Sequence, residues 1–60
     1  MNISFESWLE AFLDVMVEKG GMTLEEAKEI PLEALEFYYQ DDLTPAQAAQ
    51  NEINFAGVIL

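Results

Sequence analysis

The stretch "SFESWLEAFLDVMVEKGG", residues 4–21, determines the fold class of this 60-residue chain. Its apolar residues recur at spacings of three and four, which is the pattern of an amphipathic helix with one buried face. Ser4 precedes the pattern as a candidate N-cap. Gly20 and Gly21 follow it, and one of them is expected in the left-handed conformation that ends many helices. We therefore predict a helix over residues 4–19.

Two capping boxes mark where further helices begin. In "TLEE" (residues 23–26) and "TPAQ" (residues 44–47) a threonine stands three positions before Glu or Gln, so each pair can satisfy two free amides of a helix start. Pro31 lies between the boxes and suits the first turn of a helix, although it ends a preceding one. These signals predict one all-α domain over residues 1–60, a small bundle of three to four short helices at about 4–19, 23–30, 31–40 and 44–54.

The sequence ends in the apolar segment "NFAGVIL", residues 54–60. This C-terminal tail could extend the last helix or form an extended segment, and it could pack onto the bundle or contact a second subunit. A chain of this length buries only about 60% of its unfolded surface, so its core is small. The small core and the apolar tail together make a homodimer one expectation.

The charge of the chain is strongly one-sided. Twelve Asp and Glu residues against Lys19 and Lys28 give a formal net charge of -10. Phosphate backbones and anionic membrane surfaces repel such a chain, so we predict no direct nucleic-acid binding and no membrane binding. No run approaches the roughly 18 apolar residues that a membrane span requires. We expect a cytoplasmic protein whose partner is another protein.

The residue types that most enzymes depend on are missing. The chain has no histidine, cysteine or arginine, which removes the commonest general base, the usual zinc ligands and bidentate phosphate clamps. Gly20 and Gly21 lack the Lys-Ser/Thr that follows in a phosphate-binding loop. Asp41 and Asp42 lack the remaining pattern of a calcium loop and are expected to form a solvated turn. The sequence therefore predicts no cofactor, no metal site and no enzymatic activity.

A row of acidic residues follows the outer face of the first predicted helix. Its members are four positions apart, so they lie about 6 Å from one another along the helix axis. Like charges at this spacing destabilise a helix by a few tenths of a kcal/mol per pair. The row could imitate the phosphates of a DNA strand, or it could be the solvated face of an acidic protein. The four residues are Glu6, Glu10, Asp14 and Glu18.

The aromatic residues provide a second candidate surface. We expect Trp8, Phe12 and Phe37 in the core, since large aromatic side chains on helices are usually buried. Tyr38 and Tyr39 are adjacent, and a helix cannot bury two successive side chains equally. One of the two tyrosines is therefore a candidate interface anchor, with an apolar ring and a wet hydroxyl.

The layout "FESWLEAFLDVMVEKGGMTLEEAKEIPLEALEFYYQDDLTPAQAAQNEI" resembles small acidic accessory proteins of tailed bacteriophages. Those proteins pair an amphipathic helix with a Gly-Met-Thr turn, a Glu-Glu-Ala helix and an acidic turn before a Pro-x-x-Ala-Ala helix. Their functions are generally unknown, and some bind and disable host proteins. The resemblance implies a viral origin and a host protein as partner in the bacterial cytoplasm. DNA mimicry and a structural role as a homo-oligomer are the alternatives.

Overall fold

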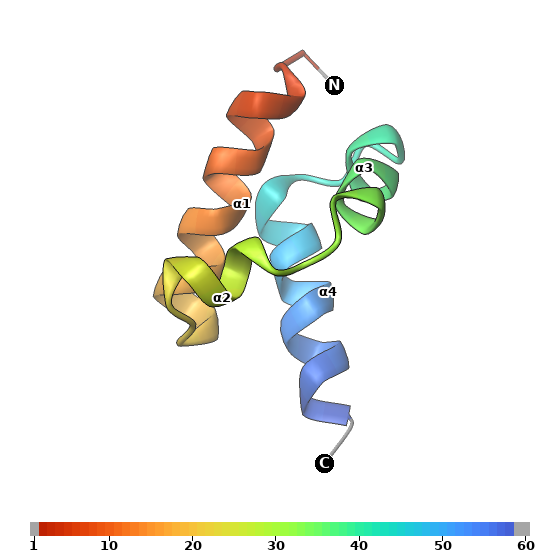
Figure 1. Ribbon diagram of the computed structural model, residues 1–60. Coiled ribbons are helices and arrows are strands. Elements are labelled where there is room, and N and C mark those ends of the chain that lie inside the picture. Colours follow the sequence, from red (N-terminus) through yellow and green to blue (C-terminus); the bar gives the residue numbers. More distant parts are fainter. Residues whose placement is uncertain (1, 59–60) are drawn as a thin grey trace.

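A computed structural model describes residues 2–58 of the chain, and within this range it contains helices and no strand. The four helices are α1 (Phe5–Gly20), α2 (Leu24–Lys28), α3 (Leu32–Gln40) and α4 (Pro45–Val58) (Figure 1). The predicted all-α bundle is confirmed. The prediction left residues 55–60 open between helix and extended chain. The backbone stays helical to Val58, and residues 59–60 lie outside the described residues.

Helix α1 contacts each of the other three helices and packs most extensively against α4. In Figure 1 these two helices lie side by side near the start of α4 and diverge toward the C-terminal ends of both, with α2 beside the C-terminal half of α1 and α3 on the other side of the bundle. The stripe Trp8, Phe12 and Met16 of α1 is fully buried, because residues four apart share one helix face. Ala48 and Ala49 of α4 are also fully buried, and their small side chains let the two helices approach closely.

The helix starts are capped as the sequence predicts. The Ser4 hydroxyl accepts a hydrogen bond from the amide of Ser7. The Thr23 hydroxyl accepts from the Glu26 amide at 3.2 Å, while the Glu26 carboxylate accepts from the Thr23 amide at 2.9 Å. The second box, between Thr44 and Gln47, has the same two bonds. Both capping boxes are confirmed.

The helix ends differ in part from the prediction. Gly21 has a φ of 70° and is the left-handed cap of α1. Helix α2 ends at Lys28, two residues before the predicted end, because Pro31 restricts the residue before it to extended conformations and α2 cannot continue through that residue. Pro31 itself is the N-cap of α3.

The acidic turn between α3 and α4 is a Schellman motif. The amide of Asp42 donates to the Tyr39 carbonyl, and the amide of Leu43 donates to the Tyr38 carbonyl, which satisfies the last carbonyls of α3. Asp42 has a φ of 61°, in the left-handed region that glycine occupies most readily. Asp41 and Asp42 are both exposed, as expected for a solvated turn.

An aromatic cluster holds this turn against α1. The Trp8 ring stacks between Phe5 and Phe12, with ring centroids 6.0 and 5.6 Å away. Its indole Nε1–H donates to the Leu43 carbonyl at 2.8 Å. Trp8 therefore buries its apolar body in the core and uses its polar atom to fix the start of α4.

Candidate interaction surfaces

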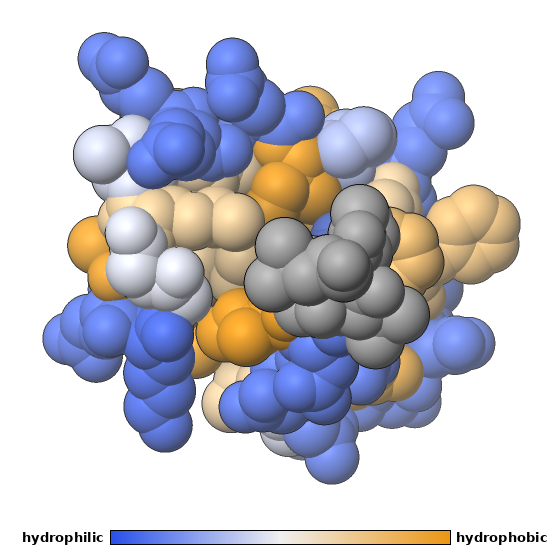
Figure 2. All heavy atoms as spheres, turned by 90° about the horizontal axis from the view of Figure 1, so that it is seen from below, coloured by the Kyte–Doolittle hydropathy of each residue, from blue (hydrophilic) through white to orange (hydrophobic). Residues whose placement is uncertain are grey.

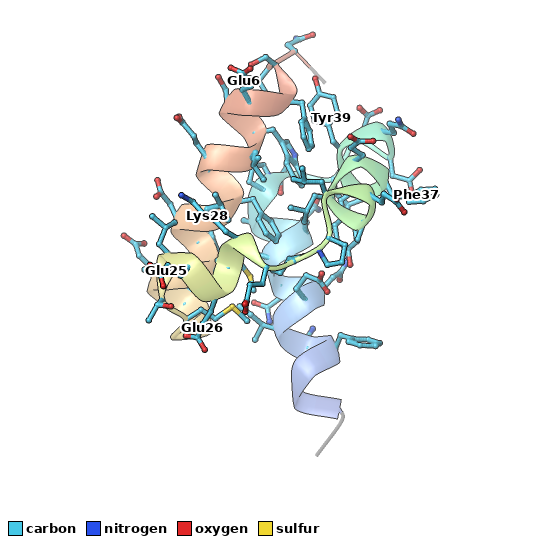
Figure 3. All side chains as sticks on the ribbon, viewed as in Figure 1. Glu6, Glu25, Glu26, Lys28, Phe37 and Tyr39 are labelled. Carbon is cyan, nitrogen blue, oxygen red and sulfur yellow. The ribbon has the colours of Figure 1, made fainter. Side chains whose placement is uncertain are left out.

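The acidic row predicted on the first helix exists as a face of α1. Glu6, Glu10, Asp14 and Glu18 are all exposed, opposite the buried stripe of Trp8, Phe12 and Met16. Figure 3 shows Glu6 pointing away from the bundle at the N-terminal end of α1. The structure thus brings these four carboxylates together on one solvent-facing surface.

Tyr39 is held inside the fold. It is half-buried, and its ring meets Phe5 and Trp8 edge-on, with centroid distances of 5.3 and 5.9 Å. Its hydroxyl donates to the carbonyl of Ile3. In Figure 3 the side chain points from α3 toward the N-terminal end of α1. Through these contacts Tyr39 packs α3 against the N-terminal part of α1 and bonds it to the residues before that helix.

Tyr38 is also half-buried. The two tyrosines are therefore buried to a similar degree, and neither stands out as the exposed one of the pair. Partial burial raises the pKa of the Tyr38 hydroxyl, and the charge of the Glu52 carboxylate and a hydrogen bond with it raise this pKa further. The pair joins α3 to α4. Of the six predicted site residues, the four acids form an open surface and the two tyrosines have partners within the fold.

Phe37 is the aromatic residue that the sequence interpretation misplaced. The prediction assigned it to the core, and this is wrong, because 71% of its surface is exposed. Leu35 is the residue of α3 that enters the core, with 1% exposure. Two positions along a helix correspond to a rotation of about 200°, so Phe37 must point away from the core once Leu35 points into it.

The outer face of α3 combines this phenylalanine with carboxylates. Glu33, Glu36, Phe37 and Gln40 line a surface recess, and Figure 3 shows the Phe37 ring pointing outward from the bundle. No other residue with a large apolar side chain is as exposed among those described. We call these four residues the α3 face.

A second recess lies between α1 and α2. Leu13 and Leu24 contribute its apolar surface, and Glu10, Asp14 and Lys28 supply its charges. Leu13 is half-buried and Leu24 is 49% exposed. We call this recess the α1–α2 groove.

Apolar residues also reach the surface at the lower end of the bundle, between groups of hydrophilic side chains (Figure 2).

Two further findings concern metal ions and membranes. Within residues 2–58, no group of three or more Asp or Glu side chains is placed to hold a metal ion. None of the helices in this range is both long and apolar enough to cross a membrane. Compared with known protein families, curated proteins and solved structures, the chain matches none. The function must therefore be inferred from the surfaces themselves.

Proposed function

We propose that the protein acts by protein–protein contact, without catalysis, and that the α3 face is its contact surface. The observation that carries the proposal is the 71% exposure of Phe37. Aromatic residues, phenylalanine included, are enriched in the cores of protein–protein interfaces. In line with the resemblance, the proposal makes this a phage-type accessory protein that binds a host protein in the bacterial cytoplasm.

The exposed ring is large enough to anchor a complex. Burying a phenylalanine side chain fully stabilises by about 1.5–3 kcal/mol, and most of the Phe37 ring is available for burial by a partner. Phe37→Ala should therefore weaken the complex by about 2 kcal/mol, which is a factor of about 30 in Kd. Its fold should stay intact because the ring makes little contact with the core.

Phe55 provides a matched control. It is 65% exposed and lies on α4 rather than α3, so Phe55→Ala removes a similar apolar area from a different surface. The partner would be captured from bacterial lysate with the wild-type protein and identified, and the affinity of each variant would then be measured by calorimetry. We expect the large loss only for Phe37→Ala. Equal losses, or no loss for Phe37→Ala, would show that the α3 face is not the anchor.

DNA mimicry is the second candidate, and the exposure of the whole acidic row favours it. Changing Glu6, Glu10, Asp14 and Glu18 to the corresponding amides should then abolish binding to the partner, and DNA should compete for the same site. Binding should also weaken steeply with salt, since opposite charges would meet across the interface. A complex that survives high salt and these four changes excludes mimicry.

Self-association is the third candidate, because the exposed Phe55 could meet a second copy. Light scattering should then show a dimer, and removal of residues 55–60 should lower the observed mass. A full-length chain that stays monomeric at high concentration excludes this use of the tail.

A further inference from the structure

The α1–α2 groove places an apolar surface beside one edge of the acidic row. We infer that it binds a basic amphipathic helix of a partner protein, with one apolar side chain seated between Leu13 and Leu24. Lysine or arginine residues one turn apart on that helix face Glu10 and Asp14. This is a second site, separate from the α3 face, and it does not depend on Phe37.

The spacing of the acids fits such a partner. Glu10 and Asp14 are four positions apart on α1, which corresponds to an axial separation of about 6 Å. Basic residues at positions i and i+4 of a partner helix have the same separation, so two charge pairs form together when the helices run side by side. A helix seated in an apolar groove is one of the recurrent modes of peptide recognition.

Of the two leucines in the groove, Leu13 packs against the core, so the free apolar surface comes mainly from Leu24. Helix α2 enters the core through Ala27, which is fully buried, whereas Leu24 at its first position is 49% exposed. The capping box of α2 uses Thr23 and Glu26 only. A polar residue at position 24 would therefore leave this capping box intact, and the exposed half of the leucine is available to a ligand.

Lys28 places one cationic side chain in the wall of the groove. It lines the same recess as Glu10 and Asp14, and in Figure 3 it extends from α2 toward α1. The methylene stem of a lysine can cover apolar surface while its charge stays in water. A basic partner residue would use the same surface and would be repelled by Lys28, so this lysine limits the affinity.

The charge of the chain selects among the occupants. A second copy brings another -10 to the interface, and an anionic membrane or nucleic acid is repelled in the same way. A basic helix is attracted by the field of the whole molecule and is also steered toward it, which increases the association rate. Charge complementarity therefore favours the basic amphipathic helix.

The test uses the full chain and three fluorescent synthetic peptides of equal length. The first has a leucine stripe flanked by lysines at i and i+4, the second replaces the lysines with glutamine, and the third replaces the leucines with alanine. Anisotropy titrations measure affinity, and amide chemical shifts locate the peptide on the protein. We expect tight binding of the first peptide only, with the largest shifts around Leu13 and Leu24.

Variants with equal changes in charge distinguish the contribution of the groove acids to binding from that of the overall negative charge. The double variant Glu10→Gln with Asp14→Asn should weaken binding of the first peptide about fivefold. The double variant Glu33→Gln with Glu36→Gln on α3 removes the same charge and should weaken this binding by less than about twofold. Leu24→Ser should weaken binding, whereas Leu32→Ser, at a position that is 56% exposed on α3, should not. Lys28→Gln should strengthen binding about two- to fivefold.

Several outcomes would overturn the inference. Equal losses for the two double-charge variants, or equal binding of the alanine peptide, would mean that only the overall charge attracts the peptide. Shifts away from Leu13 and Leu24 would place the binding elsewhere. A wild-type dimer that Leu24→Ser dissociates would identify a second copy as the occupant. Phe37→Ala should not change the affinity for the first peptide. A failure of the groove proposal can therefore be distinguished from a failure of the proposal that the α3 face binds a partner.

Discussion

Two adjacent glycines at the end of α1 should respond to alanine substitution with opposite signs. Gly20 is helical, and a Cβ there would meet Ile53 Cγ1 at 3.6 Å and Met16 Cε at 3.8 Å, which are ordinary van der Waals distances. Alanine is favoured over glycine in a helix interior by about 1 kcal/mol, and less at a helix end. We expect Gly20→Ala to stabilise the protein by about 0.5 kcal/mol.

Gly21→Ala should destabilise the protein by about 1 kcal/mol or slightly more, because its φ of 70° is left-handed. A Cβ on Gly21 would meet nothing within 4 Å, so the cost comes from the backbone alone. In a domain of this size 1 kcal/mol shifts Tm by about 4–8 °C. Thermal unfolding followed by circular dichroism should therefore show Gly20→Ala about 2–4 °C above wild type and Gly21→Ala about 4–8 °C below it.

Gly21→Asn is the control for this reasoning. Asparagine tolerates the left-handed region better than alanine does, so its loss of stability should be the smaller of the two. Equal losses for Asn and Ala at position 21 would refute a conformational origin. A destabilised Gly20→Ala would mean that the contact with Ile53 is tighter than the structure indicates.

Three further substitutions probe single contacts. Trp8→Phe removes the indole donor from the Leu43 carbonyl and should cost about 1–3 kcal/mol in urea unfolding; a loss below about 0.5 kcal/mol would contradict the anchoring role. Asp42→Gly should be more stable than Asp42→Ala by about 1 kcal/mol in thermal unfolding, since glycine accepts the positive φ, and equal Tm values would contradict this. The hydrogen bonds from the Thr23 amide and hydroxyl lower the pKa of the Glu26 carboxyl. The ionised carboxylate therefore stabilises the fold fully at pH values above the ordinary glutamate pKa, and this stabilisation is lost as the pH falls through the lowered pKa. The stability of Glu26→Gln relative to wild type, measured by urea unfolding at several pH values, should therefore rise in acid, and a pH-independent difference would be the contrary result.

The helices of the fold were predictable because their signals are local. Ser4, Thr23 and Thr44 act on amides within three residues of themselves, and the glycine cap acts on the helix that precedes it. The extension of α4 to Val58 was less predictable, since the apolar residues after position 54 suit a helix and an extended chain alike.

The surfaces were predictable only in part. The acidic row follows from helical spacing alone, so all four of its members lie where the sequence places them. Phe37 required knowledge of which face of α3 packs inward, and its hydrophobicity suggested the opposite. A signal was present, because Phe37 falls on the same side of the helix as Glu33 and Glu36 and opposite Leu35. The α1–α2 groove depends on how two helices meet, which no local pattern reports.

The pairing of α1 with α4 has a consequence for how the chain folds during synthesis. The two helices that share the main contact are separated by α2 and α3 in the sequence, so the face of Trp8, Phe12 and Met16 leaves the ribosome well before Ala48 and Ala49 can cover it. Translation proceeds at roughly 5–20 residues per second, and the wait therefore lasts on the order of seconds. Throughout that time the apolar face of the nascent helix is exposed to the cell, while the carboxylates on its opposite face give neighbouring nascent chains a mutual electrostatic repulsion.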